Sequence, residues 1–201
     1  MPAAIAHADG LRRCHWVDAS PEYMAYHDAE WGVPRGDDQG LFEQLCLEGF
    51  QSGLSWRTIL MKREAFRRAF SGFDPARVAR YGEREVQALL ADAGIVRHRG
   101  KIEAVVNNAR RALEMQEREG SLGAFFWGHE APAGSPSTYG ASTSPQSEAL
   151  SRALKKLGWK FVGPTTVYAF MQSVGMVNDH SPDCHCHARC ERARRAFARP
   201  R

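Results

Sequence analysis

Four side chains of the types that bind soft metal ions lie near the two ends of the chain. Cys14 and His27 are close to the start, and His180 and Cys184 are close to the end. Two sulfur and two nitrogen donors would complete a closed Cys₂His₂ tetrahedron, the usual form of a structural zinc site. Such a site would tie the two ends of the chain together, and the chemistry would then have to lie in the middle.

Spacing alone does not select the C-terminal ligands. His180 and Cys184 are four residues apart, which places both side chains on one side of a helical turn or a compact loop. A closed set of four ligands would indicate a structural metal, whereas three ligands and a water would indicate a catalytic one. For any single residue a buried structural side chain is the more common reading. The adjacent sequence CHCHARC offers rival donors, which are His185, Cys186, His187 and Cys190.

A carboxylate within an apolar segment is the second feature that could carry chemistry. Glu48 follows Leu45, Cys46 and Leu47, and a buried carboxylate must be paired, protonated or functional. Core packing explains most single aromatic residues, but an aromatic box beside a carboxylate suits a flat cationic ligand such as a nucleobase. Five aromatic residues lie in the same part of the chain, and they are Trp16, Tyr23, Tyr26, Trp31 and Trp56.

The segment VGPTTVYAFMQSVG, residues 162–175, has the pattern of a glycine-containing turn that leads into a helix. Such a turn can direct backbone N–H groups at a phosphate, and Gly163 would allow close approach of the backbone. Lys155, Lys156 and Lys160 precede the turn and would add the positive charge that phosphate contacts need. Alone this is a weak signal for nucleic-acid binding, because many turns between helices contain glycine.

Size and composition are those of a globular protein. The chain has 201 residues, of which 43% are hydrophobic and 25% are charged, so it can bury a core as one domain or two small ones. Five cysteines and eight histidines favour metal binding in a reducing compartment over a disulfide framework. The sequence pattern indicates neither a secretory signal nor a transmembrane helix.

The net charge of +4 comes from the C-terminal end of the chain. Residues 188–201 hold six of the 27 basic and one of the 23 acidic side chains, which leaves 21 basic and 22 acidic side chains elsewhere. A terminal basic run is often only a solvated tail, so the net charge is weak evidence for nucleic-acid binding. A local cluster of basic side chains is more informative, and it consists of Arg97, His98, Arg99 and Lys101.

Hydrophobic periodicity predicts helices almost throughout, and strand signals are essentially absent. Asp74 followed by proline predicts a helix start, and Gly94 and Gly120 predict helix ends. Residues 131–145 are rich in Pro, Gly, Ser and Thr and predict a loop. The expected fold is a single all-α domain with its ends drawn together. Its clearest helical patterns are at about 41–49 and at 55–70, 85–93, 99–119, 147–157 and 165–174.

Several short motifs occur in a fixed order along the chain. RCHWV at 13–17 and YHDAEWGVP at 26–34 precede CLEGFQSGLSW at 46–56. AGIVRHRGKI at 93–102, KFVG at 160–163 and VNDH at 177–180 complete the series. Together they resemble the 3-methyladenine DNA glycosylase I family of bacteria, within the helix-hairpin-helix superfamily. The resemblance covers residues 12–187 and leaves an N-terminal extension, 1–11, and a basic C-terminal tail, 188–201.

The resemblance implies a structural zinc ion that joins the N- and C-terminal segments. Its implied ligands are Cys14, His27, His180 and Cys184. The resemblance also implies a pocket for the damaged base, with Glu48 as the catalytic carboxylate. The implied base-binding side chains are Trp16, Tyr23, Tyr26 and Trp56.

A helix-hairpin-helix DNA-binding element is implied as well. One set of DNA contacts falls where a side chain is pushed into the duplex, at Gln51, Gly53 and Leu54. The hairpin itself falls at Val162, Gly163, Thr165 and Thr166. Related glycosylases place a catalytic aspartate just beyond the hairpin. Asp179 lies there in this sequence, and we expect it to orient a zinc ligand instead.

The implied activity is hydrolytic excision of 3-methyladenine from alkylated double-stranded DNA, with the free base as product. The base must first be flipped out of the helix. Methylation at N3 gives adenine a positive charge and makes it a good leaving group, so selection can rest on an aromatic, cation-binding pocket. No lysine is obviously placed for Schiff-base chemistry, so we expect a monofunctional enzyme, a cytoplasmic monomer without a membrane partner.

Two alternatives to this function are compatible with the residues alone. A zinc-stabilised DNA-binding module without catalysis would share the metal site and the hairpin, but it would have no use for a carboxylate in an aromatic pocket. A zinc hydrolase would need an open coordination position on the metal.

Overall fold

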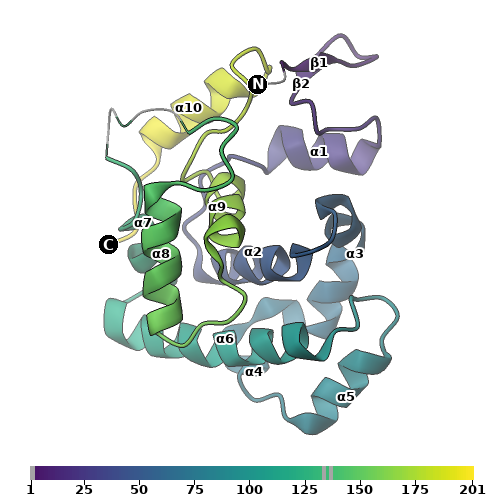
Figure 1. Cartoon of the computed structure of the whole chain (residues 1–201), viewed down its shortest axis with the longest axis vertical. Coiled ribbons are helices and arrows are strands. Elements are labelled where there is room, and N and C mark those ends of the chain that lie inside the picture. Colours follow the sequence, from purple (N-terminus) through teal and green to yellow (C-terminus); the bar gives the residue numbers. More distant parts are fainter. Residues whose placement is uncertain (1–2, 133–134, 136–137) are drawn as a thin grey trace.

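A computed structural model describes residues 3–132, 135 and 138–201. The all-α prediction is confirmed (Figure 1). In the described part of the chain, the only exception is a pair of short antiparallel strands, β1 and β2, of two residues each. None of the described helices is long and apolar enough to cross a membrane. The elements in chain order are β1 (Ile5–Ala6), β2 (Arg12–Arg13), α1 (Pro21–Ala29), α2 (Asp38–Gln51), α3 (Trp56–Ala69), η1 (Ser71–Phe73), α4 (Pro75–Val78), α5 (Glu83–Ala91), α6 (Arg99–Glu119), α7 (Leu122–Trp127), α8 (Pro145–Lys156), α9 (Pro164–Ser173) and α10 (His187–Ala196).

The centre of the fold is α2, whose residues 40–50 are all buried. Asp37 starts this helix by accepting a hydrogen bond of 2.7 Å from a backbone amide of the first turn, as an N-cap residue does. The helices α3, α6, α7 and α9 pack around it. A helix enclosed in this way is expected to be apolar on every side, so the burial of Glu43, Gln44 and Glu48 on α2 needs an explanation.

Most predicted helices form within two residues of the expected bounds. Residues 99–119 match α6, and 55–70, 147–157 and 165–174 correspond to α3, α8 and α9. The helices α1, α7 and α10 are not indicated by the periodicity. Only two residues of α1 and one of α10 are buried, so neither helix has a long apolar stripe that periodicity could detect. Helix α7 has only six residues, which is too short for a periodic pattern.

The segment 131–145 is mostly a connection, as the composition predicts. Ser144 ends it by capping α8, because its side chain and that of Ser147 each accept the other's backbone N–H at 3.1 and 2.8 Å. Residues 133, 134, 136 and 137 of the segment lie outside the described residues.

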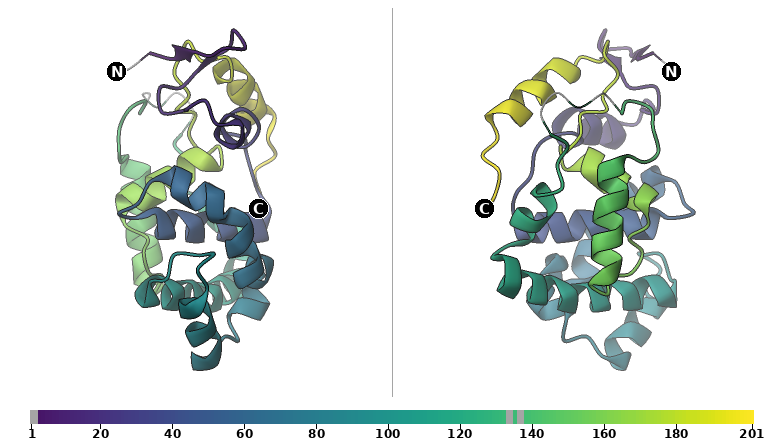
Figure 2. Two further views of the ribbon diagram at one scale, coloured as in Figure 1. Left: turned by 90° about the vertical axis from the view of Figure 1, so that its right-hand side faces the viewer. Right: turned by 60° about the vertical axis from the view of Figure 1, so that its left-hand side comes forward.

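Buried apolar side chains form two groups. The main core lies around α2 and contains closely packed rings of Phe50, Phe66, Phe70 and Phe73. A second group, which we call the terminal core, joins the two ends of the chain. Figures 1 and 2 show the N-terminal hairpin, α1 and α10 together at one end of the molecule, with α4 and α5 at the other. The terminal core consists of Ala4, Cys14, Val17, Tyr26, Trp31, Leu60, Cys184, Cys186 and Cys190.

Residues 188–201 differ from the solvated tail that their charge suggests, because most of them belong to α10 and its continuation. Cys190 is fully buried in the terminal core. Arg194 donates to the backbone carbonyls of Gly175 and Met176, both at 2.9 Å. Glu130 accepts from both Arg194, at 3.2 Å, and Arg199, at 2.9 Å. Arg194 and Arg199 therefore fasten this segment to the body of the protein, and Arg189 adds a hydrogen bond to the carbonyl oxygen of Asp28.

Candidate active site

The four candidate metal ligands meet in the terminal core. Cys184 Sγ lies 3.5 Å from His27 Nε2 and 3.6 Å from His180 Nδ1, and Cys14 Sγ lies 3.6 Å from the same His180 nitrogen. In a tetrahedral zinc site with Zn–S of about 2.3 Å and Zn–N of about 2.0 Å, sulfur and nitrogen lie about 3.5 Å apart. The donors and their spacing therefore fit a tetrahedral metal ion.

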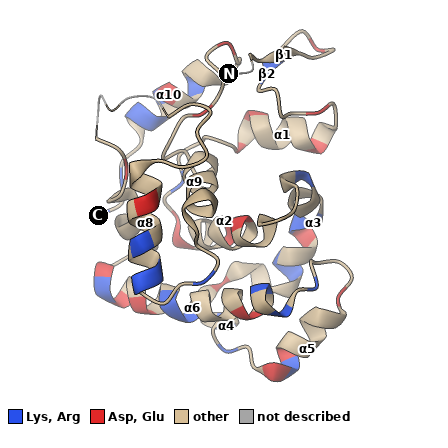
Figure 3. Ribbon diagram, in the orientation of Figure 1, with Lys and Arg blue, Asp and Glu red and all other residues tan. Residues whose placement is uncertain are grey.

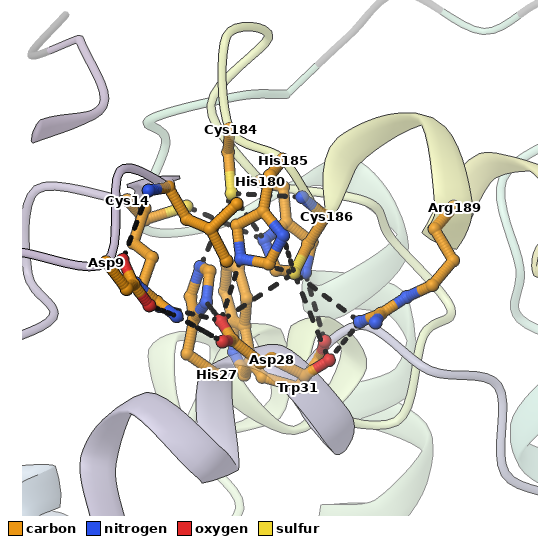
Figure 4. Close-up of polar contacts among 12 residues, drawn as sticks. Asp9, Cys14, His27, Asp28, Trp31, His180, Cys184, His185, Cys186 and Arg189 are labelled. Carbon is orange, nitrogen blue, oxygen red and sulfur yellow. Dashed lines mark hydrogen bonds and ion pairs between the residues drawn. The ribbon is translucent and has the colours of Figure 1, made fainter. Parts of the chain in front are cut away.

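Both histidines are held so that one ring nitrogen faces the other ligands. His27 Nδ1 lies 2.8 Å from the carboxylate of Asp28, and His180 Nε2 lies 3.0 Å from the carbonyl oxygen of Trp31. Figure 4 shows the residues of the cluster with their polar contacts as dashed lines. An acceptor behind each ring fixes its orientation, which is the usual arrangement around a metal-binding histidine.

Backbone amides support the two sulfur atoms. The N–H of Ser181 donates to Cys14 Sγ at 3.3 Å, and the N–H of Cys186 donates to Cys184 Sγ at 3.4 Å. Hydrogen bonding from the Cys14 thiol lowers the pKa of Cys184, with a further contribution from Cys186. A thiolate is the form of cysteine that binds a metal, so the surroundings of Cys184 favour ligation.

The rival donors His185 and Cys186 face Asp28. His185 Nε2 lies 3.0 Å from Asp28 Oδ1, and Cys186 Sγ lies 3.9 Å from the same oxygen. Arg13 donates to this carboxylate at 2.6 Å. Burial acts to raise the pKa of Asp28, but the hydrogen bonds from Arg13, His27 and His185 lower it overall. Asp28 is thus an ionised acceptor that holds His27 on one side and the rival donors on the other.

A cavity of about 290 Å³ opens beside the cluster of candidate metal ligands. Two ring contacts shape it, since Trp16 meets Trp31 edge-on with centroids 5.0 Å apart, and Tyr26 lies 5.3 Å from Trp56. Glu48 also lines it. The five aromatic residues that the sequence grouped together are all in its wall, and they are Trp16, Tyr23, Tyr26, Trp31 and Trp56.

The cluster of candidate metal ligands forms part of the support for this wall. The ring of Trp16 meets that of His27 at 5.3 Å, and the ring of Trp31 meets that of His180 at 4.6 Å. Cys14 itself lines the cavity. Two candidate ligands therefore pack directly against two aromatic residues of the cavity.

Glu48 is the buried acid of the cavity. It is 4% exposed, and Gln44, one turn earlier on α2, donates to its Oε1 at 2.8 Å. Burial raises the pKa of Glu48 to about 8, and the Gln44 hydrogen bond offsets only part of that effect. Burial, with a contribution from Glu48, also raises the pKa of Tyr26. The free cavity thus favours a donor or a cation opposite Glu48.

Asp179 is a second carboxylate in the cavity wall. Its Oδ2 accepts from the Tyr168 hydroxyl at 2.7 Å and from Gln172 Nε2 at 2.8 Å. Its Oδ1 is buried and has no hydrogen-bond partner among the described residues. The expectation that this carboxylate orients a metal ligand is wrong, because its hydrogen bonds go to α9.

Comparison with known proteins bears on what such a site does. The model of the methyladenine glycosylase family matches residues 16–187. The chain belongs to this family.

Individual members of the methyladenine glycosylase family match along nearly their whole length. DNA-3-methyladenine glycosylase 1 of Escherichia coli is 48% identical over 182 residues, 88% of this chain and 97% of the relative. A crystal structure of 3-methyladenine DNA glycosylase I superposes with a TM-score of 0.80 at 51% identity, covering 87% of this chain and 99% of that one. The structure of 3-methyladenine DNA glycosylase I from Staphylococcus aureus, solved to explain 3-methyladenine recognition, superposes with a TM-score of 0.81 at 36% identity. The match covers 87% of this chain and 96% of that one.

The turn after α2 carries the residues that the family resemblance places near DNA. Gly53 has a φ of +79°, and the N–H of Leu54 donates to the carbonyl of Gln51 at 2.7 Å. This tight turn leaves the Leu54 side chain 40% exposed. Gln51 lines the cavity, so the turn and the cavity adjoin.

The residues expected in the hairpin lie between α8 and α9. Gly163 is the N-cap of α9, and Thr165 and Thr166 are in its first turn. Val162 is buried, and its carbonyl oxygen accepts from the Ser151 hydroxyl at 2.6 Å, so its side chain faces the core. The turn therefore presents Gly163 and the first turn of α9.

Sequence reasoning did not identify Gln44 and Gln172, two of the polar residues that complete this methyladenine glycosylase cavity, and it gave Asp179 a different role. Gln44 could have been found, because it precedes Glu48 by four residues and such pairs face each other on a helix. Gln172 and Asp179 come together only through the packing of α9, for which the sequence holds no local signal. The sequence also did not show that two members of the basic cluster are engaged within the protein, since Lys101 is buried and Arg99 is paired with Glu83 at 2.9 Å.

Proposed function

We propose that the protein is a monofunctional DNA glycosylase that flips 3-methyladenine out of alkylated double-stranded DNA and hydrolyses its N-glycosyl bond. The observation that carries this proposal is Glu48, a buried carboxylate with one hydrogen-bond donor, in a cavity walled by aromatic rings. A methyladenine glycosylase with such a cavity can select a flat, positively charged base. A DNA-binding module without catalysis would have no use for it.

Glu48 is proposed to recognise the methylated base by charge and by hydrogen bonding. Its pKa of about 8 means that it holds a proton in the free protein at neutral pH. When the cationic base binds, Glu48 releases that proton to solvent, and the resulting carboxylate accepts a hydrogen bond from the exocyclic amine of the base. The rings of Trp16, Tyr23, Tyr26 and Trp56 favour the cation over a neutral base.

Departure of the base completes the reaction. The C–N bond to the sugar breaks, its electron pair neutralises the methylated base, and water adds to the sugar carbon and releases a proton. Because the leaving base is already cationic, the protein need not protonate it. Its contribution is to extrude the base, orient it and hold a carboxylate against it. The product is free 3-methyladenine.

The metal is proposed to be a structural zinc ion. Two cysteines and two histidines form a closed tetrahedral set, and all four are nearly inaccessible to solvent, with exposures of 0 to 5%. Such a site leaves no position for substrate. Zinc would tie the terminal segments together and keep Trp16 and Trp31 in the cavity wall. The proposed ligands are Cys14, His27, His180 and Cys184.

DNA is proposed to contact a helix-hairpin-helix element and the turn after α2. The first backbone N–H groups of a helix lack intrahelical partners, so the amides of Thr165 and Thr166 can bind a phosphate. Figure 3 shows basic residues in the last turn of α8, beside this turn, where Lys155 and Lys156 lie. The exposed Leu54 is proposed to enter the gap that the flipped base leaves.

We assign the glycosylase domain to residues 12–187, preceded by an extension, 1–11. Residues 188–201 complete α10 and pack against this domain. We expect the protein to act as a monomer in the bacterial cytoplasm, without a membrane partner.

Release of base from methylated DNA tests the proposed function directly. Duplex DNA treated with a methylating agent should yield free 3-methyladenine and abasic sites, with no strand cleavage until alkali is added. Chromatography of the supernatant and denaturing gels of the DNA measure the two products. Unmethylated duplex is the control. Binding to DNA without any base release would establish the non-catalytic alternative instead.

Leu54→Ala should lower excision from duplex DNA by about tenfold. The variant shortens a side chain that is 40% exposed, so the fold should stay intact. Without the Leu54 side chain in the gap of the duplex, the flipped base can return to the stack more easily. Single-turnover kinetics on duplex substrate measure the effect. Met61→Ala truncates a similarly exposed apolar side chain on α3 and serves as the control. Equal rates for both variants would contradict the role of Leu54.

A further inference from the structure

Two buried polar residues of α6 are not used by the proposed chemistry. Lys101 is 8% exposed and Asn108 is 4% exposed, although polar side chains at such depth usually serve a specific partner. They are seven residues apart, which is close to two helical turns and about 10 Å along the axis. Both side chains therefore leave the same face of one rigid helix.

Lys101 holds the end of α2. Its Nζ donates to the carbonyl oxygens of Phe50, at 2.8 Å, and Ser52, at 2.5 Å. The last carbonyls of a helix lack intrahelical donors, and here one ammonium group supplies two. The residues that follow form the turn of Gly53 and Leu54. Lys101 thus fixes the point from which the exposed Leu54 side chain projects.

Asn108 holds the turn between α8 and α9. Its Nδ2 donates to the carbonyl oxygen of Lys160 at 2.9 Å, and its Oδ1 accepts the N–H of Lys160 at 2.8 Å. The neighbouring Asn107 donates to the carbonyl of Gly158, also at 2.9 Å. Both backbone groups of Lys160 are therefore bound to one side chain of α6.

The backbone next to this contact is strained. Phe161 has a φ of +56°, a conformation that a non-glycine residue keeps only when its surroundings fix it. The ring is 40% exposed, although the Phe161 backbone lies close to Gly49 of α2. The paired hydrogen bonds of Asn108 fix the backbone of the preceding residue. The strain is thus localised in the turn that leads to Gly163 and α9.

We propose that Lys101 and Asn108 are positioning residues that set the separation of the turn after α2 and the turn before α9 on a DNA duplex. This proposal rests on the proposed function, in which both turns contact DNA. Leu54 can fill the gap in the stack only while the first turn of α9 binds the backbone of the same duplex. α6 is the one described helix whose side chains bind the backbone of both turns.

Lys101→Met is expected to lower excision from duplex DNA by about 10- to 100-fold, because small displacements of positioned groups cost that much. Excision from a single-stranded methylated oligonucleotide should fall much less, since an unpaired base needs no side chain to take its place. Asn108→Ala should lower the same duplex-to-single-strand ratio. Binding of free 3-methyladenine, followed by tryptophan fluorescence, should stay within about twofold of wild type.

Lys62→Met is the matched control. Lys62 also donates to two carbonyl oxygens, those of Ala93 and Gly94, at 3.1 and 3.2 Å, but it anchors a loop away from both turns. Its variant should keep the wild-type ratio. If Lys101→Met does not fold, a glycine inserted after Gly53 gives a second test, because it frees Leu54 from the contact while leaving Lys101 in place.

Three distinguishable results would overturn either the positioning role or the glycosylase function on which it rests. An unchanged duplex-to-single-strand ratio in Lys101→Met would refute the positioning role. A salt dependence of DNA binding that becomes shallower by about one counterion would identify Lys101 as a direct phosphate contact instead. Wild-type protein that releases no base from either substrate would refute the proposed function itself.

Discussion

Replacing Glu48 with glutamine is expected to lower kcat/KM for release of 3-methyladenine by about 10- to 100-fold, the usual cost of losing a hydrogen bond to a charged partner. The variant keeps the shape of the side chain and its contact with Gln44. It removes the negative charge that complements the methylated base. Single-turnover excision from methylated duplex DNA measures the loss.

The same substitution should make the free protein more stable at pH 8. The pKa of Glu48 is about 8 in the folded protein against 4.5 for the ordinary side chain, so the folded state keeps a proton that the unfolded chain releases. The contribution of Glu48 to the free energy of unfolding is fully present below about pH 4.5. It is lost as pH rises towards 8, by up to about 1.4 kcal/mol per pH unit. Glutamine has no proton to lose and avoids this penalty.

Thermal unfolding of both proteins at pH 5 and pH 8 measures that difference. Wild type should lose stability relative to Glu48→Gln between the two values, since the titration lies in that window. Glu43→Gln is the matched control, because Glu43 is also a buried acid of α2 but is paired with Arg67 at 2.8 Å. It should keep wild-type excision. Full activity in Glu48→Gln would refute the assigned role, and a general loss of stability would show that the variant is misfolded.

Much of the fold could be predicted because its helices carry strong local signals. The stripe of Ile102, Val105 and Ala109 on α6 and the Asp74 cap of α4 can be recognised in the sequence, and those helices form. In contrast, α10 buries Cys190 alone, and its arginines look like a solvated run. Its position depends on Glu130 and on carbonyls near residue 175, which only the folded chain brings to it.

The candidate site shows the same division between local and tertiary information. Glu48 could be identified because Leu45, Cys46 and Leu47 directly precede it. The partners of Asp179, and the use of Lys101 as a donor to carbonyls, could not. From the sequence alone, a basic residue in a basic cluster indicates a DNA contact. Only the structure shows that Lys101 is buried and that its ammonium group binds backbone carbonyls within the protein.

Loss of a ligand from the proposed zinc site is expected to cause the largest change in the folded structure of the protein. Cys184→Ser should abolish stoichiometric zinc binding and open the terminal core, while the main core around α2 and α6 stays folded. Among the described residues, the two groups of buried side chains meet only along α3, where Trp56 packs against both, so the terminal core can lose structure while the rest of the main core is retained. Hydrogen exchange should show lost protection in α1 and around residues 180–190. Protection in α2 and α6 should be retained.

Base release by Cys184→Ser should fall at least about 100-fold, because Trp16 and Trp31 rest on the candidate ligands and a displaced wall no longer orients the base. Treating wild type with a chelator should reproduce the exchange pattern, and adding zinc should restore it. Metal content of the purified protein is measured alongside.

Two cysteines provide matched controls for this result. Cys186→Ser alters a buried neighbour in the same segment that faces Asp28, and Cys46→Ser alters a buried cysteine of α2 in the main core. Both should keep one equivalent of zinc. Metal loss in Cys186→Ser with retention in Cys184→Ser would reverse the ligand assignment. If chelation stops excision while amide protection is unchanged, the metal takes part in the chemistry rather than in the structure, because a structural ion cannot leave without loosening the segments that it joins.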